Sequence, residues 1–135
     1  MIKEVEALVE RSQAALVLTQ HGGDLNVDHQ TVFRAAMTAT RPVPGQTVRE
    51  VLAFEVGSST EWAFQRFAPA FRPNTFVDIT ATLDRKVAAM EVYADEVRAF
   101  PHPRSPESLR AQAVRWGSTV GVGAAEAFDL VWRSW

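Results

Sequence analysis

A continuous apolar run near the N-terminus constrains the fold more than any other feature of this sequence. Residues Ala14 to Thr19 read Ala-Ala-Leu-Val-Leu-Thr, with no alternation of apolar and polar residues. A strand with one solvated face alternates, whereas an uninterrupted run predicts a strand that is covered on both faces. The preceding segment, Ile2 to Ser12, repeats apolar side chains at helical spacing and predicts a short amphipathic helix. A helix followed by a buried strand is half of an α/β repeat.

The rest of the chain continues this alternation of helices and strands. Strands are expected over residues 48–56 and 75–79, and a final apolar segment over 124–132. Helices are expected over about 29–40, from 80 or 82 to about 97, and from Ser105 through Trp116. Asn26 or Asp28 can cap the first helix and Ser105 the last. The middle helix has the expected buried stripe Leu83, Val87, Met90, Val92 and Tyr93. No repeat or linker is present, so residues 1–135 are expected to form a single domain.

Charge and composition exclude several classes of partner. The formal net charge is −2, and the Lys and Arg residues are scattered, which argues against binding nucleic acid or an anionic membrane surface. No apolar stretch approaches the ~20 residues that a membrane helix needs, and the N-terminus lacks a signal-peptide core. We therefore expect a cytoplasmic protein. The chain has no cysteine, so a transition metal would need histidine and carboxylate ligands.

Two polar loops, residues 20–29 and 57–62, each follow a predicted strand. In open α/β sheets, ligands bind beyond the carboxyl ends of the strands, which makes these loops candidate sites. The Asp28-His29 pair in the first loop suits a zinc ligand beside a carboxylate that orients it. The alternative is a histidine in the first turn of a helix beside its capping Asp. A catalytic zinc usually needs three protein ligands, and the chain has three histidines but no compact motif such as HExxH.

Two further polar segments are candidate substrate contacts. The second loop, Ser58 to Glu61, can hydrogen-bond a polyhydroxyl substrate, and Trp62 can stack on a sugar ring. Its alternative is a Ser/Thr-rich turn with Trp62 buried as a plug. His102 and Arg104, between prolines, can hold a phosphate or an acyl oxygen. A surface connector whose Arg forms a local salt bridge is the alternative for that segment.

Taken in order, these segments resemble the PIG-L/LmbE family of N-acetylglucosaminyl deacetylases. The motifs are HGGDLNVDH before a helix, RP-x-PG, LAFEV-x-SSTEW, FRPNTFVDIT, FPHPRS and a closing AAEAF. They extend from about Lys3 to Val131, almost the whole chain. The resemblance implies a Rossmann-like α/β three-layer sandwich. It also implies a metal-dependent hydrolase that removes an acetyl group from an N-acetylated amino sugar or a related amine.

The resemblance also implies roles for individual residues. In that family a His and an Asp of an N-terminal AHPDDE motif bind zinc (Zn2+) together with a later His, which is matched here by His29. Asp28 matches the acidic neighbour that tunes or orients the site. Asn26 stands where many members have a His that aids the oxyanion, so either His21 takes that role or Asn26 donates the hydrogen bond itself. The residues expected to contact substrate are Ser59, Thr60, Glu61, His102 and Arg104.

The AHPDDE segment, with two metal ligands and the general base, has no match in this chain. We therefore expect a fold and a zinc site that are incomplete at the N-terminus, completed by a missing segment or a partner chain, and little turnover by this chain alone. One alternative is a non-catalytic sugar-binding module. Another is a homo-oligomer, in which an exposed sheet edge or an uncovered apolar face pairs with a second copy.

Overall fold

The structure is a computed structural model that describes all residues from 1 to 135. It confirms a mixed α/β architecture of helices and strands. The chain divides into two compact units. The first unit comprises Met1–Asn74 and Phe128–Trp135, and the second comprises Thr75–Ala127. None of the helices combines the length and the apolar character needed to span a lipid bilayer.

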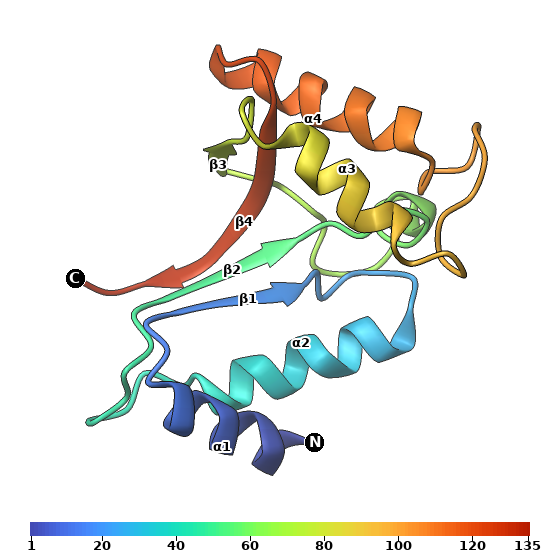
Figure 1. The fold of residues 1–135 in the computed structure, drawn as a ribbon. Coiled ribbons are helices and arrows are strands. Elements are labelled where there is room, and N and C mark those ends of the chain that lie inside the picture. The colour runs from blue at the N-terminus through green and yellow to red at the C-terminus, as the bar shows by residue number, and fades with distance from the viewer. The chain divides into compact units, whose positions relative to one another are not determined.

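The first unit is built from α1, α2, β1, β2 and the second part of β4. Their bounds are α1 Ile2–Ser12, β1 Leu16–Gln20, α2 Val27–Ala39, β2 Glu50–Phe54 and β4 Ala125–Arg133. Strand β1 is parallel to β2, and β2 is antiparallel to β4. Helix α2 packs on β1 and α1 packs on α2, so both helices lie on the same side of these strands (Figure 1). The core between them is formed by Val9, Val48 and Val51, with Val17, Met37 and Trp132 packed against it.

Local sequence signals fix the ends of both helices in this unit. Helix α1 ends at Ser12 because Gln13 adopts a left-handed conformation, with φ 50°. Helix α2 begins after Asn26, whose Oδ1 accepts a hydrogen bond from the backbone N–H of Asp28 at 2.8 Å. The predicted first helix and the predicted Asn26 cap are therefore confirmed.

Strand β1 corrects one prediction. The apolar run suggested a strand covered on both faces, but Leu16 is 48% exposed and Leu18 is 51% exposed, whereas Thr19 is buried. The strand lies at the edge of the sheet, with β2 as its only neighbour. Its inner residues face the helices, and its outer leucines have no covering layer. An apolar edge of this kind is what the homo-oligomer alternative requires.

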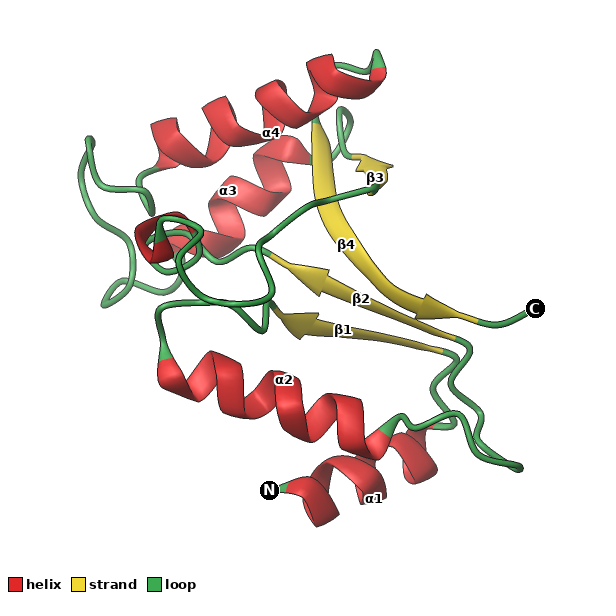
Figure 2. Cartoon of the chain, turned by 180° about the vertical axis from the view of Figure 1, so that it is seen from behind, coloured by secondary structure: helices red, strands yellow, loops and turns green.

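The second unit is built from β3, α3, α4 and the first residues of β4. Their bounds are β3 Thr75–Asp78, α3 Leu83–Glu91 and α4 Pro106–Val120. Helices α3 and α4 pack side by side, and α4 also contacts β3 (Figure 2). The core consists of Ile79, Ala113 and Ala124, with Leu83 packed against it. Helix α4 begins as predicted, because the Ser105 Oγ accepts a hydrogen bond from the N–H of Ser108 at 3.1 Å.

Helix α3 is shorter than its sequence predicts. It ends at Glu91 instead of continuing to about residue 97. Val87 is buried as expected, but Val92 is 80% exposed and Tyr93 is 66% exposed. Apolar spacing extends a helix only where there is a surface for the stripe to cover. That surface is absent beyond Glu91, and the chain continues in turns, with Tyr93 N–H bonded to the carbonyl of Met90.

Candidate functional site

The loop between β1 and α2 begins at His21, directly after the last residue of the strand. The backbone N–H of His21 bonds to the carbonyl of Phe54 at 3.0 Å, which continues the β1–β2 pairing by one residue. The side chain is 1% exposed. The sheet therefore fixes the starting point of the loop, and the buried ring of His21 lies inside the unit.

His21 is held by a residue far away in the sequence. Its Nε2 lies 2.8 Å from the carbonyl oxygen of Pro69, and its ring meets that of Phe71 edge to face, with centroids 5.2 Å apart. A carbonyl oxygen only accepts, so Nε2 must carry the donated proton. The other ring nitrogen, Nδ1, is buried and has no partner. The N–H of a neutral His21 is thus already used, which argues against this residue as the donor to a substrate oxygen.

The most informative contact in the loop joins His29 to Asp24. The Nδ1 of His29 lies 2.8 Å from the Oδ2 of Asp24, whose side chain is completely buried. A carboxylate accepts the Nδ1 proton and thereby fixes the tautomer in which Nε2 carries a free lone pair. The His29 side chain is 17% exposed, so part of the ring reaches the surface. Nε2 of His29 is thus the ring nitrogen left with a free lone pair.

Asp24 was not among the candidates from the sequence. The structure gives it the contact with His29 that the sequence assigned to Asp28, and the carboxylate of Asp28 is exposed. The only signal for Asp24 was an acidic residue between a glycine pair and a helix cap, which is ordinary turn composition. The second oxygen of Asp24, Oδ1, is buried and has no partner. An unpaired buried oxygen is costly, which marks this residue as more than turn structure.

Asn26 lies at the N-cap of α2, three residues before His29. Residues three apart lie on the same face of a helix, so the two side chains share the start of α2. The Oδ1 of Asn26 is used as the cap, whereas its side chain is exposed and its amide N–H groups have no protein partner. Asn26 can therefore donate a hydrogen bond to a group bound near His29.

The loop after β2 is tied to the first loop by its hydroxyl groups. Ser59 is 3% exposed and Thr60 is 4% exposed. The Ser59 Oγ accepts a hydrogen bond from the N–H of Asn26 at 3.2 Å, and the Thr60 Oγ1 donates to the Oδ2 of Asp24 at 3.4 Å. Both hydroxyls thus position the loop that contains Asp24 and His29. Their contact with substrate stays a prediction.

The outer part of this second loop is more accessible. The carboxylate of Glu61 accepts a hydrogen bond from the N–H of Ser58 at 2.6 Å, and its side chain is exposed. Trp62 is 42% exposed, so it is not the buried plug of the alternative interpretation. These two residues are the part of the loop that can reach a ligand directly.

The two glycines of the first loop allow a close approach of neighbouring chain segments. A Cβ on Gly23 would lie 1.9 Å from the carbonyl oxygen of Pro69, and a Cβ on Gly22 would lie 2.5 Å from the ring of Phe33. Pro69 is the same residue that binds His21. A side chain at position 23 would push away the segment that holds the histidine.

His102 and Arg104 belong to the second unit, where both make local contacts. The Nδ1 of His102 accepts a hydrogen bond from the N–H of Arg104 at 3.1 Å, and Arg104 forms an ion pair with Glu96. This is the local salt bridge of the alternative interpretation. A role of either residue in substrate binding stays a prediction.

The residues present do not form a complete metal site. The tautomer of His29 fits a ligand that binds through Nε2. However, no group of three or more His, Cys, Asp or Glu side chains could hold a metal ion. A catalytic zinc needs about three protein ligands. Residues 1–135 alone therefore do not fit a zinc centre.

No protein-family model matches the sequence, and no curated protein matches it. Solved structures do match. A conserved protein from Thermus thermophilus superposes with a TM-score of 0.72 at 23% identity, covering 99% of this chain and 58% of that one. The 4-carboxy-2-hydroxymuconate hydratase GalB from Pseudomonas putida gives 0.69 at 23% identity, covering 99% and 59%. The N,N'-diacetylchitobiose deacetylase from Pyrococcus horikoshii gives 0.67 at 17% identity, covering 96% and 50%.

These likenesses establish the fold. The chain has the α/β fold of these three proteins and spans between 50% and 59% of their length. At identities of 17–23% these likenesses show the fold and not a shared activity.

Proposed function

We propose that this chain carries part of the site of a metal-dependent hydrolase that removes an acetyl group from an N-acetylated amino sugar or a related amine. The observation that carries the proposal is the contact of His29 with the buried carboxylate of Asp24 at 2.8 Å, in a loop that leaves the carboxyl end of β1. A carboxylate that orients a histidine in this way is typical of metal sites. The likeness to a chitobiose deacetylase supports the class of reaction.

Within this proposal each residue of the loop has a defined task. His29 binds the metal ion through Nε2, and Asp24 holds the ring in the required tautomer. Asn26, with its free amide N–H groups, is better placed than His21 to donate a hydrogen bond to the acetyl oxygen. Asp28, exposed in the first turn of α2, is proposed to tune the charge near the reacting group.

The metal ion in such an enzyme polarises a carbonyl oxygen and lowers the pKa of a bound water. The remaining metal ligands have to be supplied from outside residues 1–135, since these residues contain no group of three ligands. A partner chain or a further segment of the protein can supply them. The zinc identity and the amino-sugar substrate are likewise proposals.

The test is to measure the number of zinc ions per protein chain by elemental analysis, after zinc loading and gel filtration. His29→Ala is the matched variant. We expect zinc to be retained by the parent chain when the site is completed across an oligomer, and to be lost in the variant. Asp28→Ala, which leaves the contact of His29 with Asp24 intact, should retain more zinc than Asp24→Ala. Zinc retained in equal amount by the parent and by His29→Ala would contradict the proposed ligand.

A second measurement addresses the reaction itself. Acetate release from N-acetylglucosamine or diacetylchitobiose should be negligible with this chain alone, because its residues contain no group of three metal ligands. Zinc-dependent acetate release by the isolated chain would contradict the proposal that the site is incomplete.

The hydratase likeness favours a second candidate function. The hydratase matches this chain at 23% identity over 99% of its length, a higher identity than the deacetylase gives. Adding water to a conjugated double bond and to an amide carbonyl both require an activated water beside a group that stabilises developing charge. The two candidates are separated by their products, because hydration removes the ultraviolet absorbance of a conjugated acid and releases no acetate.

A further inference from the structure

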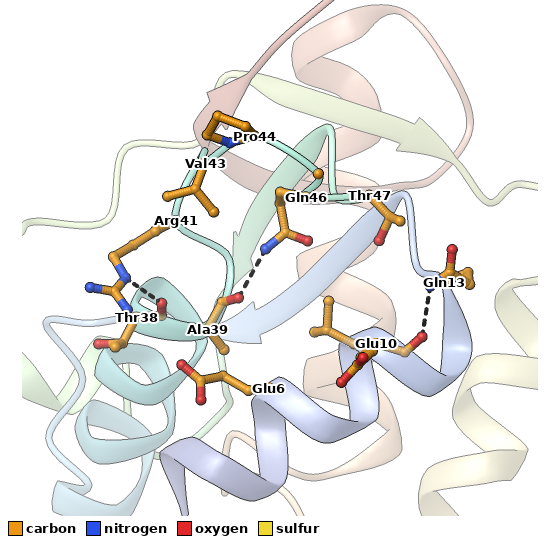
Figure 3. Close-up of a pocket in the computed structure, with 12 residues that line it drawn as sticks. Glu6, Glu10, Gln13, Thr38, Ala39, Arg41, Val43, Pro44, Gln46 and Thr47 are labelled. Carbon is orange, nitrogen blue, oxygen red and sulfur yellow. Dashed lines mark hydrogen bonds between the residues drawn. The ribbon is translucent and has the colours of Figure 1, made fainter.

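A cavity in the first unit lies at the opposite end of β1 from the loop that contains His29. It has a volume of about 380 Å³ and is lined by the second half of α1, the end of α2 and the loop that leads into β2 (Figure 3). Its residues precede β1 and β2, whereas His21 and His29 follow β1. Nothing in the proposed hydrolase site uses this cavity.

The walls of the cavity are fixed by hydrogen bonds that do not depend on a ligand. Gln46 donates from Nε2 to the carbonyl of Ala39 at 3.1 Å and accepts from the N–H of Val48 at 3.2 Å. The Thr47 hydroxyl donates to the carbonyl of Ala14 at 3.1 Å. The loop is therefore anchored to α2 on one side and to the start of β1 on the other. Because the cavity is already formed, binding does not have to include the free-energy cost of ordering this loop.

The charged groups of the cavity are of opposite sign and are not paired with each other. Glu6 and Glu10, one turn apart on α1, line it from one side, and no side chain pairs with either carboxylate. Arg41 lines it from the loop that follows α2. Its Nε donates to the carbonyl of Thr38 at 2.9 Å, and its guanidinium forms no ion pair. Its terminal N–H groups therefore remain available for an anionic group.

The backbone adds to the negative potential of the cavity. The cavity lies at the C-terminal ends of two helices, α1 and α2, where Gln13 and Ala39 line it. The C-terminal end of a helix carries a partial negative charge. The cavity therefore carries charges of both signs, with two carboxylates on α1 and an arginine beside the end of α2. Apolar side chains of Val9, Val43 and Pro44 lie between them.

We propose that this cavity binds a small zwitterionic amino compound. Its ammonium group contacts Glu6 and Glu10, its carboxylate contacts Arg41, and its methylene chain packs on Val9, Val43 and Pro44. An ammonium group has three donors and can serve both carboxylates, while the planar guanidinium matches a carboxylate in two parallel hydrogen bonds. A compound with only one of the two charges leaves one wall unpaired. The site is independent of the proposed hydrolase function.

The test is a nuclear magnetic resonance titration of the ¹⁵N-labelled chain with glycine, 4-aminobutyrate and 6-aminohexanoate at constant ionic strength. Butylamine and butyrate are the single-charge probes. We expect saturable shifts of the amide resonances of residues 6–13 and 41–47 with one of the zwitterions. The length of the zwitterion that binds most tightly reports the distance between the glutamates and Arg41. Butylamine and butyrate should each bind about tenfold more weakly.

Charge-neutral variants locate the contacts. Glu6→Gln with Glu10→Gln, and separately Arg41→Gln, should each weaken binding of the best zwitterion about tenfold. Glu4→Gln, on α1 but outside this cavity, is the matched control and should bind like the parent. An unchanged midpoint of thermal unfolding shows that a variant is folded. If the double variant is unfolded, the single variant Glu10→Gln, at an exposed position, takes its place. Absence of saturable shifts, equal binding of butylamine, or unchanged affinity in both variants would overturn the proposal.

Discussion

The loop from His21 to His29 and the connector around His102 both place histidines among turn-forming residues, but they hold them in different ways. In the loop, His21 binds a carbonyl that is 48 residues away in the sequence, and His29 binds a completely buried carboxylate. In the connector, His102 accepts from a backbone N–H two residues further on. A partner distant in the sequence for His21, and a buried carboxylate for His29, each fix the ring in one orientation and tautomer. Local partners satisfy the polar groups of a turn.

The largest expected effect comes from Gly23→Ala. The added Cβ would lie 1.9 Å from the carbonyl oxygen of Pro69, so the segment that holds His21 must move. Overpacking against backbone costs about 1–3 kcal/mol, and loss of the His21 hydrogen bond adds about 1 kcal/mol. Urea denaturation should show a lower free energy of unfolding. The imidazole resonances of His21 should change at the same time.

Gly121→Ala is the matched control for this change. Gly121 ends α4 at φ 79° and has open space around its Cβ position, so the cost there comes from backbone conformation alone. That cost is about 1 kcal/mol. If Gly23→Ala were no more destabilising than Gly121→Ala, the close contact between the first loop and Pro69 would be refuted.

The second effect tests which carboxylate orients His29. Asp24→Ala removes the buried acceptor of the His29 Nδ1 proton and leaves that donor unpaired, at a cost of about 1–3 kcal/mol. Asp28→Ala removes an exposed carboxylate and should leave the ring unchanged. The ¹⁵N shifts of the imidazole report the tautomer directly. A tautomer change in Asp28→Ala but not in Asp24→Ala would restore the assignment made from sequence.

The contrast between the two regions also explains what the sequence could and could not predict. The caps at Asn26 and Ser105 follow from short-range chemistry, and both were predicted. The loop after β1 was identified as a candidate because strand ends collect ligands. Asp24 was missed because its role depends on burial, and burial depends on the packing of Thr60 and the second loop against it.

Packing likewise decided the two errors in the fold. The run through Leu16 and Leu18 predicted a doubly covered strand, but an apolar sequence does not reveal whether a second layer is present. The stripe of α3 stops at Glu91 because no partner surface accepts Val92. Both errors concern what lies opposite an apolar side chain, which local periodicity does not encode.

A smaller effect is expected from Arg104→Ala in the connector. Arg104 pairs with Glu96, and their side chains are 24% and 54% exposed. Exposed ion pairs contribute about 0–1 kcal/mol, and salt screens them. Thermal denaturation of Arg104→Ala should therefore differ little from the parent, and the remaining difference should shrink in 1 M salt, where the screening length is about 3 Å. A loss as large as that of Asp24→Ala would show that the connector is not merely local structure.

The smallest effect concerns another local motif of the second unit, the turn after β3. The side-chain hydroxyl and the backbone N–H of Thr80 donate to the Oδ1 of Asp78 at 2.6 and 2.8 Å, and these hydrogen bonds hold the pKa of Asp78 below its usual value. A lowered pKa in the folded state means that the stabilisation is fully present above the unfolded pKa of about 4. It is lost as the pH falls through the folded pKa. Asp78→Asn should therefore be slightly less stable than the parent at neutral pH, and the two denaturation curves should converge on acidification below about pH 4. Because Asp78 is exposed, this difference in unfolding free energy between parent and variant should be the smallest of the series. The opposite result would be a difference in stability between parent and variant that widened on acidification. It would mean that folding stabilises the protonated form of Asp78. The turn would then not be held by local contacts of the kind that distinguish the second unit from the buried loop of the first.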